Sequence, residues 1–292
     1  MTSATSRLDS TSLYSLVDLL RERGIVVLAG AGCSTESGIP DYRGPEGSLR
    51  KRKPIQYNEF VRDEATRARY WARSSIGWPR MEDARPNPAH ESLARLEADG
   101  AITGIITQNV DGLHHKAGSR RVLELHGSLA WVRCLACGDR VARTEFQERL
   151  LDANPDWIAR VADTDERSAE TAPDGDAEVP GAALAAFVVP PCDACGGVLK
   201  PDVVFFGENV PAAIVTEAFD MLAEGNVLLV LGSSLTVYSG RRFLYRAWET
   251  GIPIGVVNLG PTRADEMALA KVNGRLGEVL PRLMEALLKG TA

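Results

Sequence analysis

The sequence predicts an α/β fold, in which a doubly wound parallel sheet is interrupted by a small metal-binding module. Three observations lead to this prediction: apolar runs of strand length recur, helical stretches separate them, and one segment with four cysteines breaks the alternation. Short apolar strands that alternate with helices are typical of parallel sheets covered by helices on both faces.

The first predicted element is a helix, which Ser10 or Thr11 can cap. Its apolar face carries Leu13, Leu16, Val17 and Leu20. The apolar runs of strand length are Ile25–Ala29, Ile102–Thr107, Val203–Phe206, Val227–Leu231 and Ile254–Val257. The predicted helices that alternate with them include Ala212–Ala223, Arg241–Trp248 and Leu276–Leu288. This order predicts β-α-β connections and therefore parallel strands.

The segment from about Leu129 to Leu199 does not follow this rhythm, and it holds two C-x-x-C pairs. We predict a large domain of residues 1–128 and 200–292, with residues 129–199 inserted as the small module. Within the module, the acidic stretch Asp163–Glu178 is expected to be a surface loop. A second loop is expected at Gly44–Lys53, which is rich in Gly, Pro, Arg and Lys.

Composition excludes several classes of protein. Of the 292 residues, 45% are hydrophobic, which excludes a fully disordered chain. No run of about 18 uncharged apolar residues occurs, so a membrane span is not expected. The net charge of −6 argues against a general nucleic-acid binder, because phosphate binding draws on clustered positive charge. The N-terminus lacks an apolar signal segment, so we expect a cytoplasmic protein; a mitochondrial matrix location is less expected, because there is no clear transit peptide.

The cysteines of the module point to a metal. Cys134 and Cys137 form one C-x-x-C pair, and Cys192 and Cys195 form the other. A glycine follows each pair, which suits a turn that directs two thiolates at one ion. Four sulfur ligands are typical of tetrahedral structural zinc. Thiol redox chemistry is the main alternative, although redox C-x-x-C motifs usually occur singly.

Small and polar residues follow several of the predicted strands, at the edge where open α/β sheets bind ligands. Gly30-Ala31-Gly32 comes directly after Ile25–Ala29 and is followed by Ser34 and Thr35. Such a turn can present amide N–H groups to a pyrophosphate, but alone it is equally well a structural turn. A dinucleotide fingerprint would need glycine where Thr35 stands, so an ordinary NAD dehydrogenase is a poor match.

Further polar groups are predicted at the same edge. The run Thr107–His114 (TQNVDGLH) follows Ile102–Thr107, although a solvated turn would also explain it. His126 ends the apolar stretch Val122–Leu125, and its ordinary pKa near 6.5 suits a general base. A lone histidine is more often structural or exposed, and nothing local distinguishes His126 from the other three histidines. Gly232-Ser233-Ser234 and Asn258-Leu259-Gly260 follow two more strands. Their convergence on one edge favours a binding site.

Taken together, these motifs resemble the sirtuin family of NAD-dependent protein-lysine deacylases. The motifs that carry the resemblance are GAGCSTESGIPDYR (Gly30–Arg43), TQNVDGLH, HGS (His126–Ser128), the two C-x-x-C pairs, KPDVVFFGE (Lys200–Glu208), GSSL (Gly232–Leu235) and VNLGPTRAD (Val257–Asp265). PDYR, RYWAR (Arg69–Arg73), GWP and PNPAH are similar to the class II branch, which includes mitochondrial sirtuin 4.

The resemblance implies a Rossmann-like domain with an inserted zinc module, and NAD and an acyl-lysine substrate that meet between them. It implies His126 as the catalytic base, with Asn109 as a second catalytic residue. It implies that the residues which contact NAD are Gly30, Ala31, Gly32, Ser34, Thr35, Pro40, Asp41, Tyr42, Arg43, Gln108, Asn109, Val110, Asp111, Gly232, Ser233, Ser234, Asn258, Leu259, Gly260 and Leu276. The implied products are the deacylated lysine, nicotinamide and O-acyl-ADP-ribose.

The resemblance also implies how the substrate is recognised. The segment Val203 to Gly207, with Val203, Phe205, Phe206 and Gly207, would pair with the substrate backbone. Tyr70 and Arg73 resemble the pair that reads acidic acyl groups, since arginine binds a carboxylate through two hydrogen bonds. Alternatively, the two residues face solvent on a helix, or Arg73 is turned away from the site. Expected partners are acyl-lysine proteins or peptides, not membranes or nucleic acids, and a monomer is expected. There are two alternative functions. One is protein mono-ADP-ribosylation at the same NAD site, and the other is a non-catalytic NAD-sensing or zinc-binding module.

Overall fold

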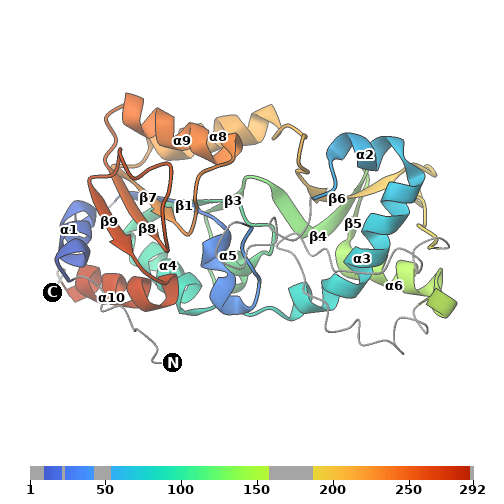
Figure 1. Cartoon of the computed structure of the whole chain (residues 1–292), viewed down its shortest axis with the longest axis horizontal. Helices are drawn as coiled ribbons and strands as arrows, with labels where there is room; N and C mark the ends of the chain where they lie inside the picture. Colours follow the sequence, from blue (N-terminus) through green and yellow to red (C-terminus); the bar gives the residue numbers. More distant parts are fainter. Residues whose placement is uncertain (1–9, 22–23, 43–53, 158–186, 290–292) are drawn as a thin grey trace.

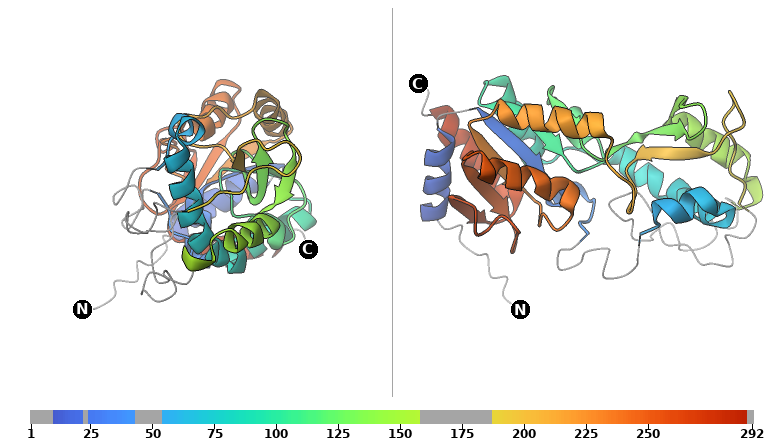
Figure 2. Two further views of the ribbon diagram at one scale, coloured as in Figure 1. Left: turned by 90° about the vertical axis from the view of Figure 1, so that its right-hand side faces the viewer. Right: turned by 90° about the horizontal axis from the view of Figure 1, so that it is seen from above.

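The computed structural model describes residues 10–21, 24–42, 54–157 and 187–289 (Figure 1). The predicted NAD contact Arg43 and the two predicted loops, Gly44–Lys53 and Asp163–Glu178, lie outside these ranges. The described chain forms two bodies that lie side by side along the long axis of the molecule, as the right-hand view of Figure 2 shows. Each body is built around its own sheet.

The larger body contains a six-stranded sheet in the order β3-β2-β1-β7-β8-β9. Its strands are β1 (Ile25–Ala29), β2 (Ile102–Thr107), β3 (Val122–Glu124), β7 (Val227–Leu231), β8 (Ile254–Asn258) and β9 (Ala270–Asn273). Every neighbouring pair is parallel. The predicted doubly wound parallel sheet is therefore confirmed, with β9 as an edge strand that the apolar pattern did not predict.

Helices cover both faces of this sheet (Figures 1 and 2). One face carries α1 (Ser10–Leu20), α4 (Pro88–Ala98) and α10 (Leu276–Lys289), and the other carries α8 (Ala212–Ala223) and α9 (Tyr238–Glu249). Strand β1 shows why both layers are needed: Val27 packs in the core below α1 and α10, whereas Val26 and Leu28 pack in the core below α8 and α9. A strand buried on both faces reads as a continuous apolar run.

The smaller body contains a three-stranded antiparallel sheet in the order β5-β4-β6. Its strands are β4 (Gly127–Cys134), β5 (Arg140–Ala142) and β6 (Leu199–Val203). The helices α2 (Tyr57–Arg62), α3 (Glu64–Asp83) and α6 (Arg143–Asp152) share its core, which includes Phe60, Trp71 and Phe146. A short helix, α5 (Leu113–Lys116), follows β2 near the junction of the two bodies (Figure 1).

One strand prediction is wrong in this region. The run Val203–Phe206 is not a strand of the parallel sheet, because the strand there is Leu199–Val203 and it pairs antiparallel with β4. Its apolar residues Val203 and Phe205 are buried in the core of the smaller body. Helices α2 and α3, which the predicted division places in the large domain, pack in that same core.

None of the helices in the described ranges combines the length and apolar character that a membrane span needs.

Candidate active site

The polar residues that follow the parallel strands meet at one edge of the large sheet. Strand β1 lies between β2 and β7, so Gly30, Gln108 and Gly232 come from three adjacent strand ends. The chain continues from β1 to one side and returns later on the other, which creates the crevice where open α/β sheets bind ligands. The predicted convergence is confirmed.

The glycines after β1 permit a close approach to the end of β7. A Cβ at Gly30 would lie 2.7 Å from Cβ of Ser233, and a Cβ at Gly32 would lie 2.8 Å from Cα of Gly232. The amide of Gly32 donates to the carbonyl oxygen of Gly232 at 2.8 Å. Gly232 itself has a φ of 57°, in the left-handed region that favours glycine. These glycines therefore have a packing role, as the structural-turn alternative supposed, and that role brings two strand ends together.

The run after β2 is a buried hydrogen-bond network rather than a solvated turn. The side-chain amide of Asn109 donates to the carbonyl oxygen of Gly30 and to Oγ of Ser34, each at 3.1 Å. The Ser34 hydroxyl in turn donates to Oδ2 of Asp111 at 2.6 Å. Asn109 and Ser34 are both buried. The Gly30 and Thr107 motifs thus form one polar cluster.

A second arm of this network involves Gln108. Its side-chain amide donates to the carbonyl oxygen of Ala29 at 3.2 Å and to Oγ of Ser233 at 3.0 Å. Gln108 therefore connects the ends of β1, β2 and β7. Ser234, next to Ser233, is half-buried, and its hydroxyl lies 3.0 Å from that of Thr236.

His126 lies just before β4, where the two bodies join. Its Nδ1 is 2.9 Å from the main-chain carbonyl oxygen of Gln108, and its Nε2 is 2.8 Å from Oγ of Ser239. Burial lowers the pKa of His126; the bond to the Gln108 carbonyl opposes this, and the nearby Arg242 lowers the pKa further. The imidazole is consequently neutral at pH 7, which is the state that a general base requires.

The predicted substrate segment is hydrogen-bonded to the main chain of His126. The amide of Val204 donates to the carbonyl oxygen of His126 at 2.8 Å, and the Phe206 carbonyl accepts a hydrogen bond from the Tyr57 amide at 2.9 Å. The Phe206 ring contacts the ring of Tyr42 edge-on, with 5.9 Å between centroids. This contact brings a predicted NAD residue to a predicted substrate residue. Gly207 is exposed and has a φ of 78°.

Tyr70 does not face solvent. It is 3% exposed, and its ring contacts Phe60, Trp71 and Phe205 at centroid distances of 5.5, 5.2 and 5.2 Å. Arg73, one helical turn later on α3, is half-buried. Tyr70 therefore contacts the predicted substrate segment through Phe205.

The remaining predicted NAD residues lie around this edge. Ala31, Pro40, Asp41 and Val110 are half-buried, and Thr35 is exposed. The side-chain amide of Asn258 donates to the carbonyl oxygens of Leu259 and Gly260 and shapes the turn after β8. Leu259 is exposed, whereas Leu276 is buried against Gly232 at the start of α10.

The four module cysteines come together. Their Sγ atoms all lie within 4.8 Å of one another, with 3.5 Å between Cys134 and Cys195 and 3.8 Å between Cys137 and Cys192. Four thiolates bound to zinc at about 2.3 Å would be about 3.8 Å apart at tetrahedral geometry, so this cluster fits the ion. Gly138 and Gly196 each have a left-handed φ and close the turns that aim the thiolates. Two C-x-x-C pairs converging on one point favour zinc over the redox alternative.

The fifth cysteine is separate from this cluster. Cys33 is buried beside the end of β7, where its thiol donates to the Leu231 carbonyl oxygen at 3.7 Å. Burial raises the pKa of this thiol to about 12, which makes it unreactive at neutral pH.

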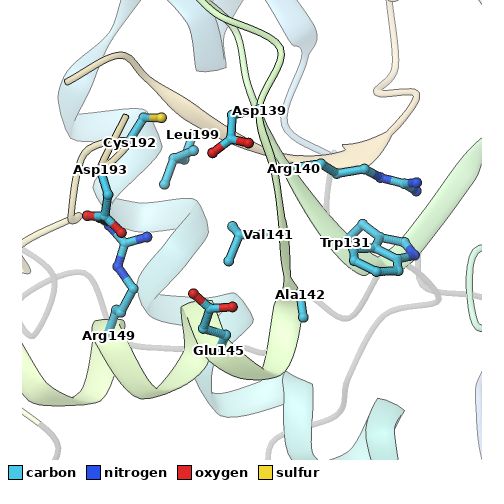
Figure 3. Close-up of a pocket in the computed structure, with 10 residues that line it drawn as sticks. All are labelled: Trp131, Asp139, Arg140, Val141, Ala142, Glu145, Arg149, Cys192, Asp193 and Leu199. Atoms are coloured by element: carbon cyan, nitrogen blue, oxygen red, sulfur yellow. Dashed lines mark hydrogen bonds and ion pairs between the residues drawn. The ribbon is translucent and has the colours of Figure 1, made fainter. Parts of the chain in front are cut away.

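A cleft of about 310 Å³ lies beside the cysteine cluster, between β5 and α6 (Figure 3). Trp131, Asp139, Glu145, Asp193 and Cys192 are among its lining residues. Arg149 and Asp193 form an ion pair at 2.8 Å on one side of it (Figure 3), and the Arg140 guanidinium lies 4.5 Å from the Trp131 ring centroid. Apart from Cys192, it contains none of the predicted site residues, so it is distinct from the polar edge.

Ser239 and Arg242 are two residues near His126 that the sequence did not predict as site residues. Both belong to the first turns of α9, which begins at Tyr238 rather than at the predicted Arg241. No local motif marks Ser239, and its contact with His126 spans 113 positions of sequence.

Comparison with known proteins agrees with this geometry. The model of the Sir2 family matches residues 30–239, which is more than half of the chain. An NAD-dependent protein deacetylase 2 of Bradyrhizobium diazoefficiens is 51% identical over 271 residues, which cover 92% of this chain and 97% of the relative. An NAD-dependent protein deacetylase 1 of Mycobacterium avium is 50% identical over 272 residues, which cover 93% of this chain and 94% of the relative.

Solved structures are similar over the same length. One described as a structural basis for the mechanism and regulation of Sir2 enzymes has a TM-score of 0.74 and 34% identity, and the match covers 96% of this chain and 99% of that one. A Sir2 histidine-to-alanine variant with a deacetylated p53 peptide and 3′-O-acetyl-ADP-ribose has a TM-score of 0.73 and 33% identity, over 94% and 97% of the two chains.

Proposed function

Because the chain belongs to the Sir2 family, we propose that its polar sheet edge is where this NAD-dependent protein deacetylase brings NAD and acyl-lysine together. The observation that carries the proposal is the position of His126. Its ring is hydrogen-bonded to Gln108 of the predicted NAD site, and its carbonyl oxygen is hydrogen-bonded to Val204 of the predicted substrate segment. One histidine is thereby fixed between the two predicted sites.

We propose the following roles for the network residues. Asn109 and Asp111, which are joined through Ser34, line the nicotinamide end of the NAD site. Gln108 and Ser233 hold the middle of the cofactor, and Ser234, Asn258 and Gly260 hold its adenosine end. Buried amide and hydroxyl groups of this kind orient a polar ligand without needing a large net charge.

NAD supplies the ADP-ribose that accepts the acyl group, with nicotinamide as the leaving group. We propose that His126 accepts the proton of a ribose hydroxyl, since its lowered pKa keeps it neutral at pH 7. We propose that the reaction takes place between the two bodies, where exclusion of water would limit wasteful hydrolysis of NAD. The four cysteines would hold a structural zinc, because together they supply the four ligands of a tetrahedral site and leave no position open for a reactant.

The preferred acyl group is a separate proposal. We propose that Tyr70 and Arg73 extend the substrate site beyond Phe205, which would suit acyl chains longer than acetyl that end in a carboxylate. The support is the contact between Tyr70 and Phe205 and the position of Arg73 one turn later on α3. We also propose that the chain belongs to the class II branch, and the RYWAR, GWP and PNPAH motifs support this placement.

A peptide panel tests both parts of the proposal. The enzyme is incubated with NAD and with acetyl-, succinyl- and glutaryl-lysine peptides, and nicotinamide release is measured. Release that depends on an acyl-peptide is expected, and its absence with every peptide would reject the site assignment. Arg73→Met should lower kcat/KM for succinyl-lysine about tenfold more than for acetyl-lysine. Equal effects on both peptides would reject the acid-reading role of Arg73. In a separate assay with labelled NAD, transfer of the label to the target protein would instead indicate ADP-ribosylation.

A further inference from the structure

The start of α9 contacts Nε2 of His126, whereas the main-chain carbonyl of Gln108 contacts Nδ1. Ser239 is the second residue of this helix, and its Oγ lies 2.8 Å from Nε2. The next residue is Gly240, and a Cβ there would overlap Oε1 of the Gln108 side chain. The main-chain carbonyl of Gln108 therefore accepts from Nδ1 of His126, while the Gln108 side chain packs against α9, the helix whose Ser239 contacts Nε2. This arrangement fixes His126, Gln108 and the first turn of α9 relative to one another.

The chemistry of these contacts decides which ring nitrogen carries the hydrogen. The Gln108 carbonyl oxygen can only accept, so the Nδ1 atom of His126 must donate to it. In a neutral imidazole the other nitrogen, Nε2, then has a free lone pair. The Ser239 hydroxyl is the group placed to donate to that lone pair. The nitrogen that would act as the base is therefore already hydrogen-bonded in the free protein.

We propose that Ser239 is a positioning residue for the reaction, which holds the Nε2 lone pair of His126 in line until the ribose hydroxyl is bound. During proton transfer the O–H bond of the sugar breaks and an Nε2–H bond forms. The Ser239 hydroxyl then changes from donor to acceptor, and it keeps the charged ring hydrogen-bonded on both sides. This inference rests on the proposed role of His126 as the base.

Ring-nitrogen NMR tests the hydrogen bond without any substrate. The chain has four histidines, so selective ¹⁵N labelling gives few signals, and His126→Ala identifies the signals of His126. We expect a protonated Nδ1 and an unprotonated, hydrogen-bond-accepting Nε2 in the wild type. In Ser239→Ala the Nε2 resonance should move to the position of a free lone pair. Thr250→Ala is the control. It removes a hydroxyl just after the C-terminal end of α9, which donates to the Arg246 carbonyl oxygen and lies at the opposite end of the helix from Ser239.

Kinetics then tests the positioning role. Ser239→Ala should lower kcat about two- to tenfold, the effect of losing one hydrogen bond, while the Kd for ADP-ribose stays unchanged. Ser239→Thr, which restores the hydroxyl, should recover most of the loss, and Thr250→Ala should retain wild-type kcat. An Nε2 resonance that does not move in folded Ser239→Ala would show that the hydrogen bond is absent, and an unchanged kcat would show that it has no positioning role. If His126→Ala keeps full activity, the base assignment fails, and the NMR result still reports the hydrogen bond itself.

Discussion

The hydroxyl of Ser34 lies 2.6 Å from Oδ2 of Asp111, and this bond joins the turn after β1 to the loop after β2. Ser34 also accepts a hydrogen bond from Asn109, so one hydroxyl connects both polar residues of the proposed nicotinamide site. Hydrogen bonds to a charged partner contribute more to stability than those between neutral groups.

Ser34→Ala should therefore loosen both Asn109 and Asp111. We expect kcat/KM for NAD to fall roughly ten- to a hundredfold, in line with the loss of a charge-assisted and a neutral hydrogen bond. Steady-state kinetics with varied NAD measures the effect. Ser15→Ala, which removes a hydroxyl on the surface of α1, is the control and should behave like wild type. A normal kcat/KM in Ser34→Ala would contradict the assigned role of this network.

His126→Ala should reduce turnover at least a hundredfold, because the proposed proton acceptor is removed. ADP-ribose should still bind, since the contacts of Asn109, Asp111 and Ser233 do not pass through the imidazole. Single-turnover assays and calorimetry separate the two effects. His115→Ala, an exposed histidine on α5, provides the matched control. Near-normal turnover in His126→Ala would reject the base.

The parallel sheet could be predicted because its strands are buried on both faces, and β1, β7 and β8 are consequently unbroken apolar runs. Helix α3 could not be predicted from an apolar pattern, because Pro79 lies inside it and its buried residues include Thr66, Ser74, Ser75 and Gly77. A helix buried on several sides among aromatic rings lacks a clean apolar stripe. Strand β6 was misplaced for a similar reason, since Lys200 and Asp202 hide its pattern.

The candidate site was predicted where strand ends and cysteine spacing carry the signal. The cysteine cluster follows from spacing alone, because each C-x-x-C turn is local. The bond between Ser239 and His126 depends on the residue at which α9 begins, and the apolar pattern placed that start at Arg241. Contacts of this kind are set by packing between elements and have no local signature.

Cys192→Ser should release the zinc, because three thiolates and a hydroxyl bind the ion less tightly than four thiolates. A zinc ion held by the four cysteines would link the turn after β4 to the turn before β6, so its loss should lower the melting temperature by several degrees. Zinc content and thermal unfolding are measured on the same sample. Cys33→Ser, which alters a buried thiol outside the cluster, should keep its zinc. A zinc-free Cys192→Ser with the wild-type melting temperature would show that the ion has no structural role.

The buried pair His90 and His114 should make the fold less stable in acid. Their ring centroids are 4.8 Å apart, and neither ring nitrogen of His114 has a hydrogen-bond partner within the described residues. Burial, together with His90 and His115, lowers the pKa of His114 to about 3. The unfolded chain takes up a proton on this side chain below about pH 6.5, whereas the folded chain does not.

The free energy of unfolding should therefore decrease as the pH falls from about 6.5, by about 1.4 kcal/mol per pH unit for this proton. His114→Leu removes no side-chain hydrogen bond among the described residues and cannot titrate, so its unfolding free energy should depend less steeply on pH by that amount. His90 and His126, whose pKa values are also lowered, keep part of the dependence. Urea unfolding at pH 5, 6 and 7 measures the slopes, with His115→Gln as the exposed control. Equal slopes for wild type and His114→Leu would show that His114 takes up its proton in the folded chain as readily as in the unfolded one.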